Sequence, residues 1–141
     1  MRALALVLLL ASPALAEAPP PGSPEWDPIG GEAFEALVEG RTLTYAPDGG
    51  EIWGVERFHP GRRVTWVRLG AECLKGIWYP AGTEDAPQVC FAYEDGSGPH
   101  CFLFYRNGEH ILSTDLDGSQ PELSADAPPE LAGFGCDYLG S

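Results

Sequence analysis

Four cysteines constrain the fold of this chain more than any other feature: Cys73, Cys90, Cys101 and Cys136. Their number is even, and in an oxidising compartment two disulfides are the expected arrangement. No two of them have the Cys-x-x-Cys spacing, so a zinc site or a redox dithiol has little support. Three of the four lie between residues 73 and 112, together with the most apolar strand-like run. We expect this stretch to be the centre of a small antiparallel β domain that disulfides hold closed.

The first sixteen residues have the pattern of a cleaved secretory signal. Arg2 supplies a positive charge, residues 3–10 form an unbroken apolar run, and Ala14-Leu15-Ala16 is a small-x-small cleavage site. The apolar run is shorter than the roughly 20 residues that a bilayer-spanning helix needs, and no later segment is a candidate membrane span. We therefore predict cleavage near Ala16 and a periplasmic or secreted protein.

The rest of the chain divides into a short lead and one domain. Residues 17–30 are rich in proline, which prevents helix formation and removes backbone donors, so we expect a flexible lead. Trp26 is the residue of this lead that could dock on the domain. Residues 31–141 are expected to form a single β domain with one modest core.

Hydrophobic periodicity predicts one short helix followed by strands. Within residues 31–40, Phe34, Leu37 and Val38 form one apolar stripe of helical spacing. The period then changes to two, and strands are expected at residues 41–45, 51–58, 62–69, 72–79, 88–93, 101–105 and after Gly108. Prolines after residue 115 argue against regular structure there, although residues 131–139 could add a last short strand. Short turns between the strands favour a meander that forms a barrel-like sheet over a compact sandwich.

The Asp95-Gly96 turn indicates one disulfide. A two-residue loop there would place Cys90 opposite Cys101, but it would also put Pro99 where the ladder needs a donor. A longer loop that ends at Pro99 avoids this conflict and still keeps the two cysteines close. The remaining pair would then be Cys73 with Cys136.

A second hairpin is expected at Asn107-Gly108. A type I′ turn at these residues would pair Phe104 with Ile111 and Leu103 with Leu112. Both faces of this hairpin are apolar, so both should be covered.

Catalytic, metal and cofactor sites find little support in the sequence, and we predict none. His59, His100 and His110 have no ligand-pair spacing, and Ser97 lacks the Gly-x-Ser-x-Gly context of a nucleophile. The segment Asp115-Leu116-Asp117-Gly118 is only a partial match to a calcium loop. With 21 acidic residues, some pair of carboxylates is expected to be close by chance.

Aromatic residues on neighbouring strands are the most informative side chains. Trp66, Trp78, Phe91 and Phe104 could line a cavity for an apolar ligand if the strands close into a barrel. They could equally fill the core, which a domain of this size needs.

Several runs of the mature chain together resemble a known group of proteins. These runs are Phe34–Tyr45, Gly54-x-Glu56, Arg62–Trp66, Cys73-x-x-Gly76-x-Trp78-Tyr79, Cys90-Phe91-x-Tyr93-Glu94 and Cys101-Phe102. The group is an uncharacterised family of small secreted, cysteine-containing proteins of alphaproteobacteria, in which a tryptophan often stands at the position of Phe102. The resemblance implies a periplasmic location and no catalytic residue.

Charge narrows the choice of partners. The net charge is −13, and the only charged residue of the predicted signal is basic, so the mature chain is more acidic still. Such a chain repels nucleic acid and anionic membranes and attracts cationic partners. The leading hypothesis is a non-enzymatic, inhibitor-like binder of a cationic protein. The alternatives are a carrier of a small apolar ligand in a barrel cavity and an enzyme that uses clustered carboxylates.

Overall fold

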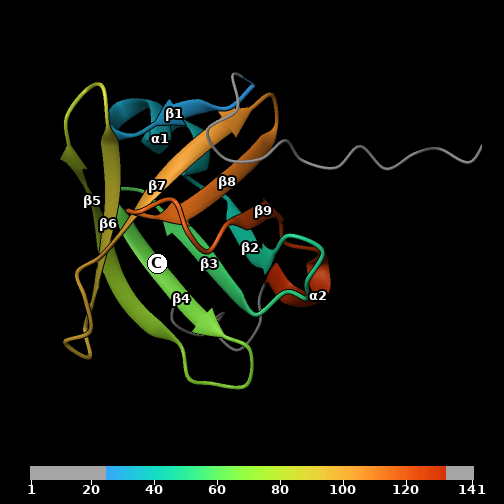
Figure 1. Ribbon diagram of the computed structural model, residues 1–141. Coiled ribbons are helices and arrows are strands. Elements are labelled where there is room, and N and C mark those ends of the chain that lie inside the picture. The colour runs from blue at the N-terminus through green and yellow to red at the C-terminus, as the bar shows by residue number, and fades with distance from the viewer. Residues whose placement is uncertain (1–24, 133–141) are drawn as a thin grey trace, which may run out of the picture.

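Eight antiparallel strands close into a barrel in the computed structural model, which describes residues 25–132 (Figure 1). The strands of the barrel are β2 (Thr42–Pro47), β3 (Gly54–His59), β4 (Arg63–Arg68), β5 (Leu74–Gly82), β6 (Pro87–Tyr93), β7 (His100–Asn107), β8 (His110–Asp115) and β9 (Glu122–Asp126). A further strand, β1 (Asp27–Ile29), and two helices, α1 (Gly31–Val38) and α2 (Pro129–Ala132), complete the described part.

The barrel is a simple meander. Each strand from β2 to β9 pairs with the next one along the chain, and β9 pairs back onto β2, where Tyr45 lies opposite Ser124. This closure leaves no free edge in the ring. The mainly β, disulfide-bonded fold with a barrel-like sheet is therefore confirmed.

Apolar side chains of alternate strand residues fill the half of the barrel beside α1. Phe34 of α1 is fully buried, and its ring packs 4.7 Å from that of Phe104 and 5.1 Å from that of Trp78, centroid to centroid. Arg62 links α1 to the barrel. It forms a 3.1 Å ion pair with Glu35 of the helix, and its guanidinium lies over the ring of Trp78 in β5. α1 thus plugs one end of the barrel, and its range lies within the residues 31–40 expected to be helical.

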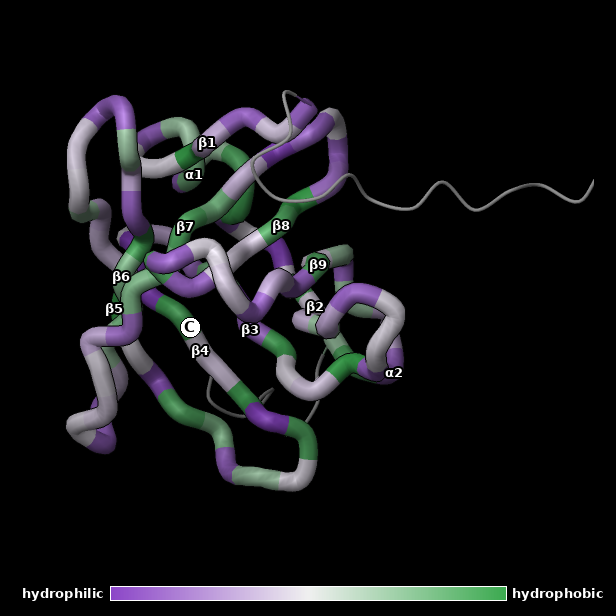
Figure 2. Tube along the Cα trace, viewed as in Figure 1, coloured by the Kyte–Doolittle hydropathy of each residue, from purple (hydrophilic) through white to green (hydrophobic). Residues whose placement is uncertain are grey.

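The hydropathy of the chain follows this arrangement (Figure 2). Strands of the barrel carry the hydrophobic stretches, and the turns between them are mostly hydrophilic. Among residues 25–132, no helix has the length and apolar character needed to cross a bilayer.

The folded part begins earlier than the boundary drawn at Gly31. β1 pairs with the end of β7 beyond the point where β6 stops, and Trp26 is only 4% exposed. Trp26 does pack on the domain, as the sequence allowed. The prediction that residues 25–30 belong to a flexible lead was wrong. Pro28 is compatible with this strand because β1 lies at the margin of the sheet.

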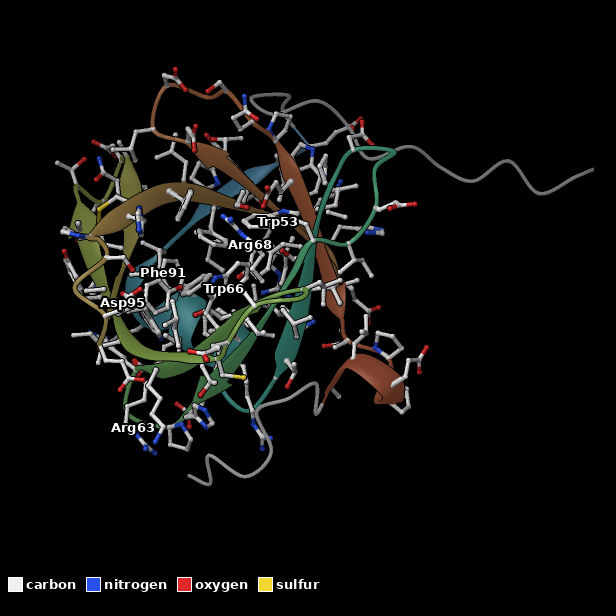
Figure 3. All side chains as sticks on the ribbon, turned by 90° about the horizontal axis from the view of Figure 1, so that it is seen from below. Trp53, Arg63, Trp66, Arg68, Phe91 and Asp95 are labelled. Atoms are coloured by element: carbon white, nitrogen blue, oxygen red, sulfur yellow. A yellow bond between two sulfur atoms is a disulfide. The ribbon has the colours of Figure 1, made fainter. Side chains whose placement is uncertain are left out.

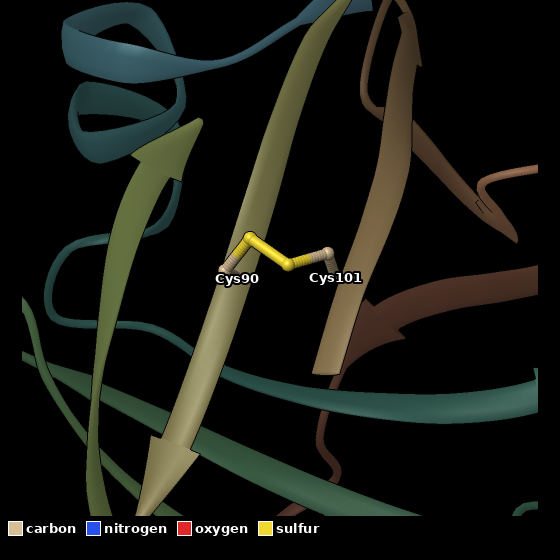
Figure 4. Close-up of a disulfide and its surroundings, with 2 residues drawn as sticks. All are labelled: Cys90 and Cys101. Atoms are coloured by element: carbon tan, nitrogen blue, oxygen red, sulfur yellow. A yellow bond between two sulfur atoms is a disulfide. The ribbon is translucent and has the colours of Figure 1, made fainter. Parts of the chain in front are cut away.

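The hairpin of β6 and β7 carries the expected disulfide. Cys90 lies directly opposite Cys101, and their sulfur atoms are bonded (Figure 4). The ladder ends at Phe91 opposite His100, so Pro99 falls in the loop, as the longer-loop alternative required. No cysteine in the described part of the chain is free. The other predicted pair, Cys73 with Cys136, involves a residue outside the described range.

The turn between β7 and β8 differs from the prediction by two residues of register. Asn107 pairs with His110, and Phe104 pairs with Ser113 instead of Ile111. Gly108 is the first residue of the two-residue loop and has φ of 57°, whereas Glu109 does not have a positive φ. A glycine with positive φ at this position is the pattern of a type II′ turn. The predicted type I′ turn centred on Asn107-Gly108 was therefore wrong.

The segment after residue 115 is more regular than expected. β9 completes the barrel between β8 and β2, and α2 begins at Pro129. Proline is tolerated in the first turn of a helix, so Pro129 did not argue against this element. The predicted last strand at residues 131–139 is wrong at its start, where Leu131 and Ala132 are helical, and the rest lies outside the described residues.

Candidate ligand-binding cavity

The half of the barrel away from α1 is hollow. A cavity of about 610 Å³ lies among the inward side chains of the strands. Its lining includes Ala71, Ser97 and Gln120, which belong to loops at the end of the barrel away from the helix. The volume falls within the roughly 300–1,000 Å³ typical of small-molecule sites.

Aromatic side chains form a large part of the wall. Seven of them line the cavity: Tyr45, Trp53, Trp66, Phe91, Tyr93, Phe102 and Phe104. The Trp66 ring lies 5.2 Å from that of Trp53 and 5.7 Å from that of Tyr45, both in edge-to-face geometry. Seen from below, Trp66 and Phe91 lie within the ring of strands, whereas Arg63 points outward (Figure 3).

The four aromatic residues singled out from the sequence divide between the cavity and the packed core. Trp66, Phe91 and Phe104 line the cavity. Trp78 is buried against Phe34 at the plugged end and is not part of the lining. Phe91 and Phe104 also belong to the buried core cluster with Trp78, so both interpretations, cavity wall and core, hold for these two rings.

Gly54 makes room for the largest of these rings. A Cβ atom at this position would lie 1.9 Å from Cη2 of Trp66, which is far closer than any real contact. The inward face of β3 therefore carries no side chain here, and the indole of Trp66 occupies the space.

Glu56 is the most deeply buried acid of the cavity. It is 3% exposed, and the Tyr93 hydroxyl lies 3.2 Å from each of its carboxyl oxygens, to which it donates. Within residues 25–132 no basic side chain pairs with it. Burial raises the pKa of Glu56 to about 8, and the hydrogen bond from Tyr93 opposes that rise. At neutral pH this carboxyl group is therefore mainly protonated.

Two hydroxyl groups near the same wall have no hydrogen-bond partner among the described residues. They are the Tyr45 hydroxyl and the Ser124 hydroxyl, on side chains that face inward from opposite positions of β2 and β9. Burial raises the pKa of Tyr45, and Glu56 and Glu122 raise it further by their negative charge. Buried polar groups without a partner are rare in folded proteins, and they often mark a place where something else binds.

The rim of the cavity carries charges of both signs. Glu122 accepts a 2.8 Å hydrogen bond from the Trp53 indole nitrogen, and burial raises its pKa. Arg68 is exposed, and its guanidinium lies 5.5 Å from the Trp53 ring centroid (Figure 3). Glu72, His100 and Asp115 also line this part of the cavity. The basic group is thus at the rim, and the deepest charge-bearing group is an acid.

No metal-binding cluster of His, Cys, Asp or Glu is found within the described residues. His59 is hydrogen-bonded to Thr65 at 2.8 Å, and its pKa is lowered by partial burial and by Arg57 and Arg63. Ser97 and Asp95 form a local turn, in which the serine donates a 2.6 Å hydrogen bond to the aspartate. These residues therefore have structural partners.

Sequence reasoning missed Glu56 and Tyr45 as site residues. The signal that could have found Glu56 is its place on β3, where Gly54, Glu56 and Phe58 share the inward face. The acids are also not all solvated and separated, since Glu56, Asp115 and Glu122 line one cavity. The alternative of carboxylate-based catalysis therefore stays a prediction.

Fold and site together define a small meander barrel with one plugged end and one aromatic-lined cavity. Comparison of the chain with family models, with curated proteins and with solved structures found no match. The resemblance to a secreted alphaproteobacterial family stays a prediction, and the functional proposal depends on this chain's own residues.

Proposed function

We propose that the protein binds a small molecule whose apolar part sits in the barrel cavity, and that it acts outside the cytoplasm without catalysing a reaction. The observation that carries the proposal is a cavity of about 610 Å³ with an aromatic wall and a few buried polar groups. Sites with these features are the usual small-molecule sites of proteins. The Cys90–Cys101 disulfide supports the location, because such bonds persist in oxidising compartments.

A second support is that Trp53 and Trp66 do not belong to the buried core cluster and only pack against it. Phe34, Phe58, Trp78 and Phe104 already form a continuous ring cluster at the plugged end. Trp53 and Trp66 instead stand beside open space. Large aromatic surface left beside a cavity is what an apolar ligand would cover.

The experiment is a titration with N-phenyl-1-naphthylamine, a neutral apolar dye whose emission increases in apolar surroundings. We expect saturable binding with micromolar affinity and quenching of the emission from Trp53 and Trp66. Ser113→Leu adds an inward side chain to the cavity wall and should weaken binding at least tenfold. The matched control is Thr83→Leu in the β5–β6 turn, which should bind like the wild type.

Two results would overturn the proposal. One is the absence of saturable dye binding to the folded wild type. The other is equal affinity in the wild type and in folded Ser113→Leu, which would place the dye outside the cavity. If Ser113→Leu does not fold, competition between the dye and a second apolar compound on the wild type decides between one saturable site and diffuse adsorption.

The hypothesis of a cationic protein partner depends on net charge alone and stays a prediction.

A further inference from the structure

We propose that the ligand is a small organic cation, an amine or quaternary ammonium with an apolar body, whose charged end lies at Glu56. This inference rests on the proposed function, because it assumes that the cavity is the binding site. It names the chemical class that the arrangement of the cavity selects.

The position of Glu56 favours a cationic ligand. Glu56 lies deep in an aromatic pocket, and its only hydrogen-bond partner among the described side chains is the Tyr93 hydroxyl. The two ion pairs of the described residues, Arg41–Asp126 and Arg62–Glu35, lie outside the cavity lining. Ionisation of a carboxyl group buried in this way is costly, and a cationic ligand beside Glu56 would offset that cost.

The aromatic wall of the cavity also favours an organic cation. Trp66, Trp53, Tyr45 and Tyr93 stand around the same cavity as Glu56. The faces of aromatic rings attract organic cations, and tryptophan does so most strongly. A carboxylate together with several aromatic rings is a combination that suits an ammonium group with a hydrocarbon body.

The Tyr45 hydroxyl points to a polar ligand group independently of the acids. The Tyr45 hydroxyl is buried, on a side chain that is 6% exposed and lines the cavity, and it has no partner among the described residues. A polar ligand group that reaches this hydroxyl would supply one. The polar end of the ligand is therefore expected near Tyr45 and Glu56, which interact electrostatically.

The balance of charge in the cavity lining disfavours an anionic ligand. Four acids, Glu56, Glu72, Asp115 and Glu122, line the cavity, against Arg68 and His100. Arg68 is exposed at the rim, so an anionic ligand would have to leave its charge at the mouth. With a net charge of −13, the whole molecule also attracts cations.

The protonation of Glu56 predicts opposite pH dependences of the affinity for a cationic and for a neutral ligand. Because the pKa of Glu56 is raised to about 8, binding of a cation at lower pH must displace its proton. The affinity for a cation should then rise with pH up to about 8 and level off above it. A neutral ligand that accepts a hydrogen bond from the protonated acid would show the opposite trend. The other titratable or charged groups that line this cavity are Tyr45, Tyr93, Arg68, Glu72, His100, Asp115 and Glu122.

The test compares three probes of similar shape by calorimetry at pH 8.5: 2-phenylethylammonium, 2-phenylethanol and 3-phenylpropionate. We expect the cation to bind at least tenfold more tightly than the alcohol, and the anion to bind most weakly. Glu56→Gln should remove the preference for the cation while it keeps the affinity for the alcohol. Glu109→Gln, an exposed acid in the turn at the plugged end, is the matched control and should keep the preference. Below pH 8, the wild type should release protons when it binds the cation, and Glu56→Gln should not.

The outcomes separate this inference from the proposed function. If the neutral dye binds but the cation binds no better than the alcohol, the inference fails and the cavity remains a site for neutral ligands. If the cation is preferred equally by Glu56→Gln, the charge is not at Glu56 and the inference fails. If neither the dye nor any probe binds the folded protein, the proposed function itself fails.

Discussion

At the scale of single residues, Glu56 lowers the free energy of unfolding as pH rises. Its raised pKa means that the folded protein holds a proton that the unfolded chain releases at lower pH. The native state therefore binds more protons than the unfolded state between the ordinary pKa of 4.5 and about 8. Under this condition the free energy of unfolding falls as pH rises, by about 1.4 kcal/mol per pH unit for one proton. A buried acid kept despite this cost is one more indication that the residue has a function.

The first prediction concerns this pH dependence. Glu56→Gln removes the ionisable group and leaves an acceptor for the Tyr93 hydroxyl. The free energy of unfolding of the variant should exceed that of the wild type by an amount that grows with pH. That growth should approach about 1.4 kcal/mol per pH unit above pH 4.5 and stop near pH 8. Urea denaturation at several pH values measures it, with Glu109→Gln as the exposed control. A constant difference between variant and wild type across this pH range would contradict the burial of a neutral acid.

At the scale of elements, α1 is the cap that closes one end of the barrel. Phe34 contacts rings from β3, β5 and β7 at once. The helix thus holds together strands that are not adjacent in the sheet.

The second prediction follows from this contact. Phe34→Ala should lower the free energy of unfolding by about 3–5 kcal/mol, because it removes a fully buried ring and leaves a cavity. Thermal and urea denaturation measure the loss. Glu32→Ala, on the exposed face of the same helix, should change stability by less than about 1 kcal/mol. If Phe34→Ala is too unstable to purify, Phe34→Leu should show a smaller loss in the same direction. A loss below about 1 kcal/mol for Phe34→Ala would show that α1 is not a structural plug.

The disulfide and the cavity lie on opposite faces of the β6–β7 hairpin. Phe91 and Phe102, the neighbours of Cys90 and Cys101, point into the barrel, so the two cysteines lie on its outer face. The covalent bond therefore stabilises the hairpin without forming part of the binding site.

The third prediction uses this separation. Replacing both Cys90 and Cys101 by alanine should lower the free energy of unfolding by about 3 kcal/mol, the value expected for closing a loop of this length. Dye affinity measured well below the unfolding transition should stay unchanged. A loss of affinity in the folded double variant would mean that the bond also shapes the cavity.

Two strands, β1 and β9, were not predicted from the sequence. β9 presents Glu122 and Ser124 to the interior, so it shows no apolar alternation. β1 contains Pro28 and is short, and only its pairing with β7 reveals it. Alternation in residues 41–45 and 62–69, and the turn residues between the segments, did predict β2 to β8. The register of the β7–β8 turn could not be predicted, since Asn107-Gly108 and Gly108-Glu109 both satisfy turn preferences.

The cavity followed from the sequence only as one of two uses for its aromatic residues. Whether Trp66 and Phe91 fill the core or border a space depends on how much volume the barrel encloses. That volume depends on the number of strands, and so on β9. Glu56 was one acid among 21, and its burial becomes evident only when the inward face of β3 is known.

At the scale of the whole molecule, the net charge of −13 acts on any ligand that approaches the cavity. A field of this sign concentrates cations near the surface, and salt screens it over about 10 Å at 0.1 M. The acids of the rim and the surplus of surface acids therefore act in the same direction.

The fourth prediction is a difference in salt dependence. The affinity for 2-phenylethylammonium should weaken several-fold between 10 mM and 300 mM sodium chloride, because screening reduces the attraction. The affinity for 2-phenylethanol should change much less under the same conditions. Calorimetry at four salt concentrations measures both. Parallel salt dependence of the two probes would show that the overall charge does not contribute to binding.

The close approach of Trp66 to the bare backbone of Gly54 has a consequence for relatives of this protein. The two positions must change together: a larger residue at position 54 requires a smaller one at position 66. Relatives that have made this exchange would keep the barrel but have a cavity of different shape. They would therefore bind different ligands. Ligand choice could thus diversify at one pair of sites, without alteration of the scaffold around it.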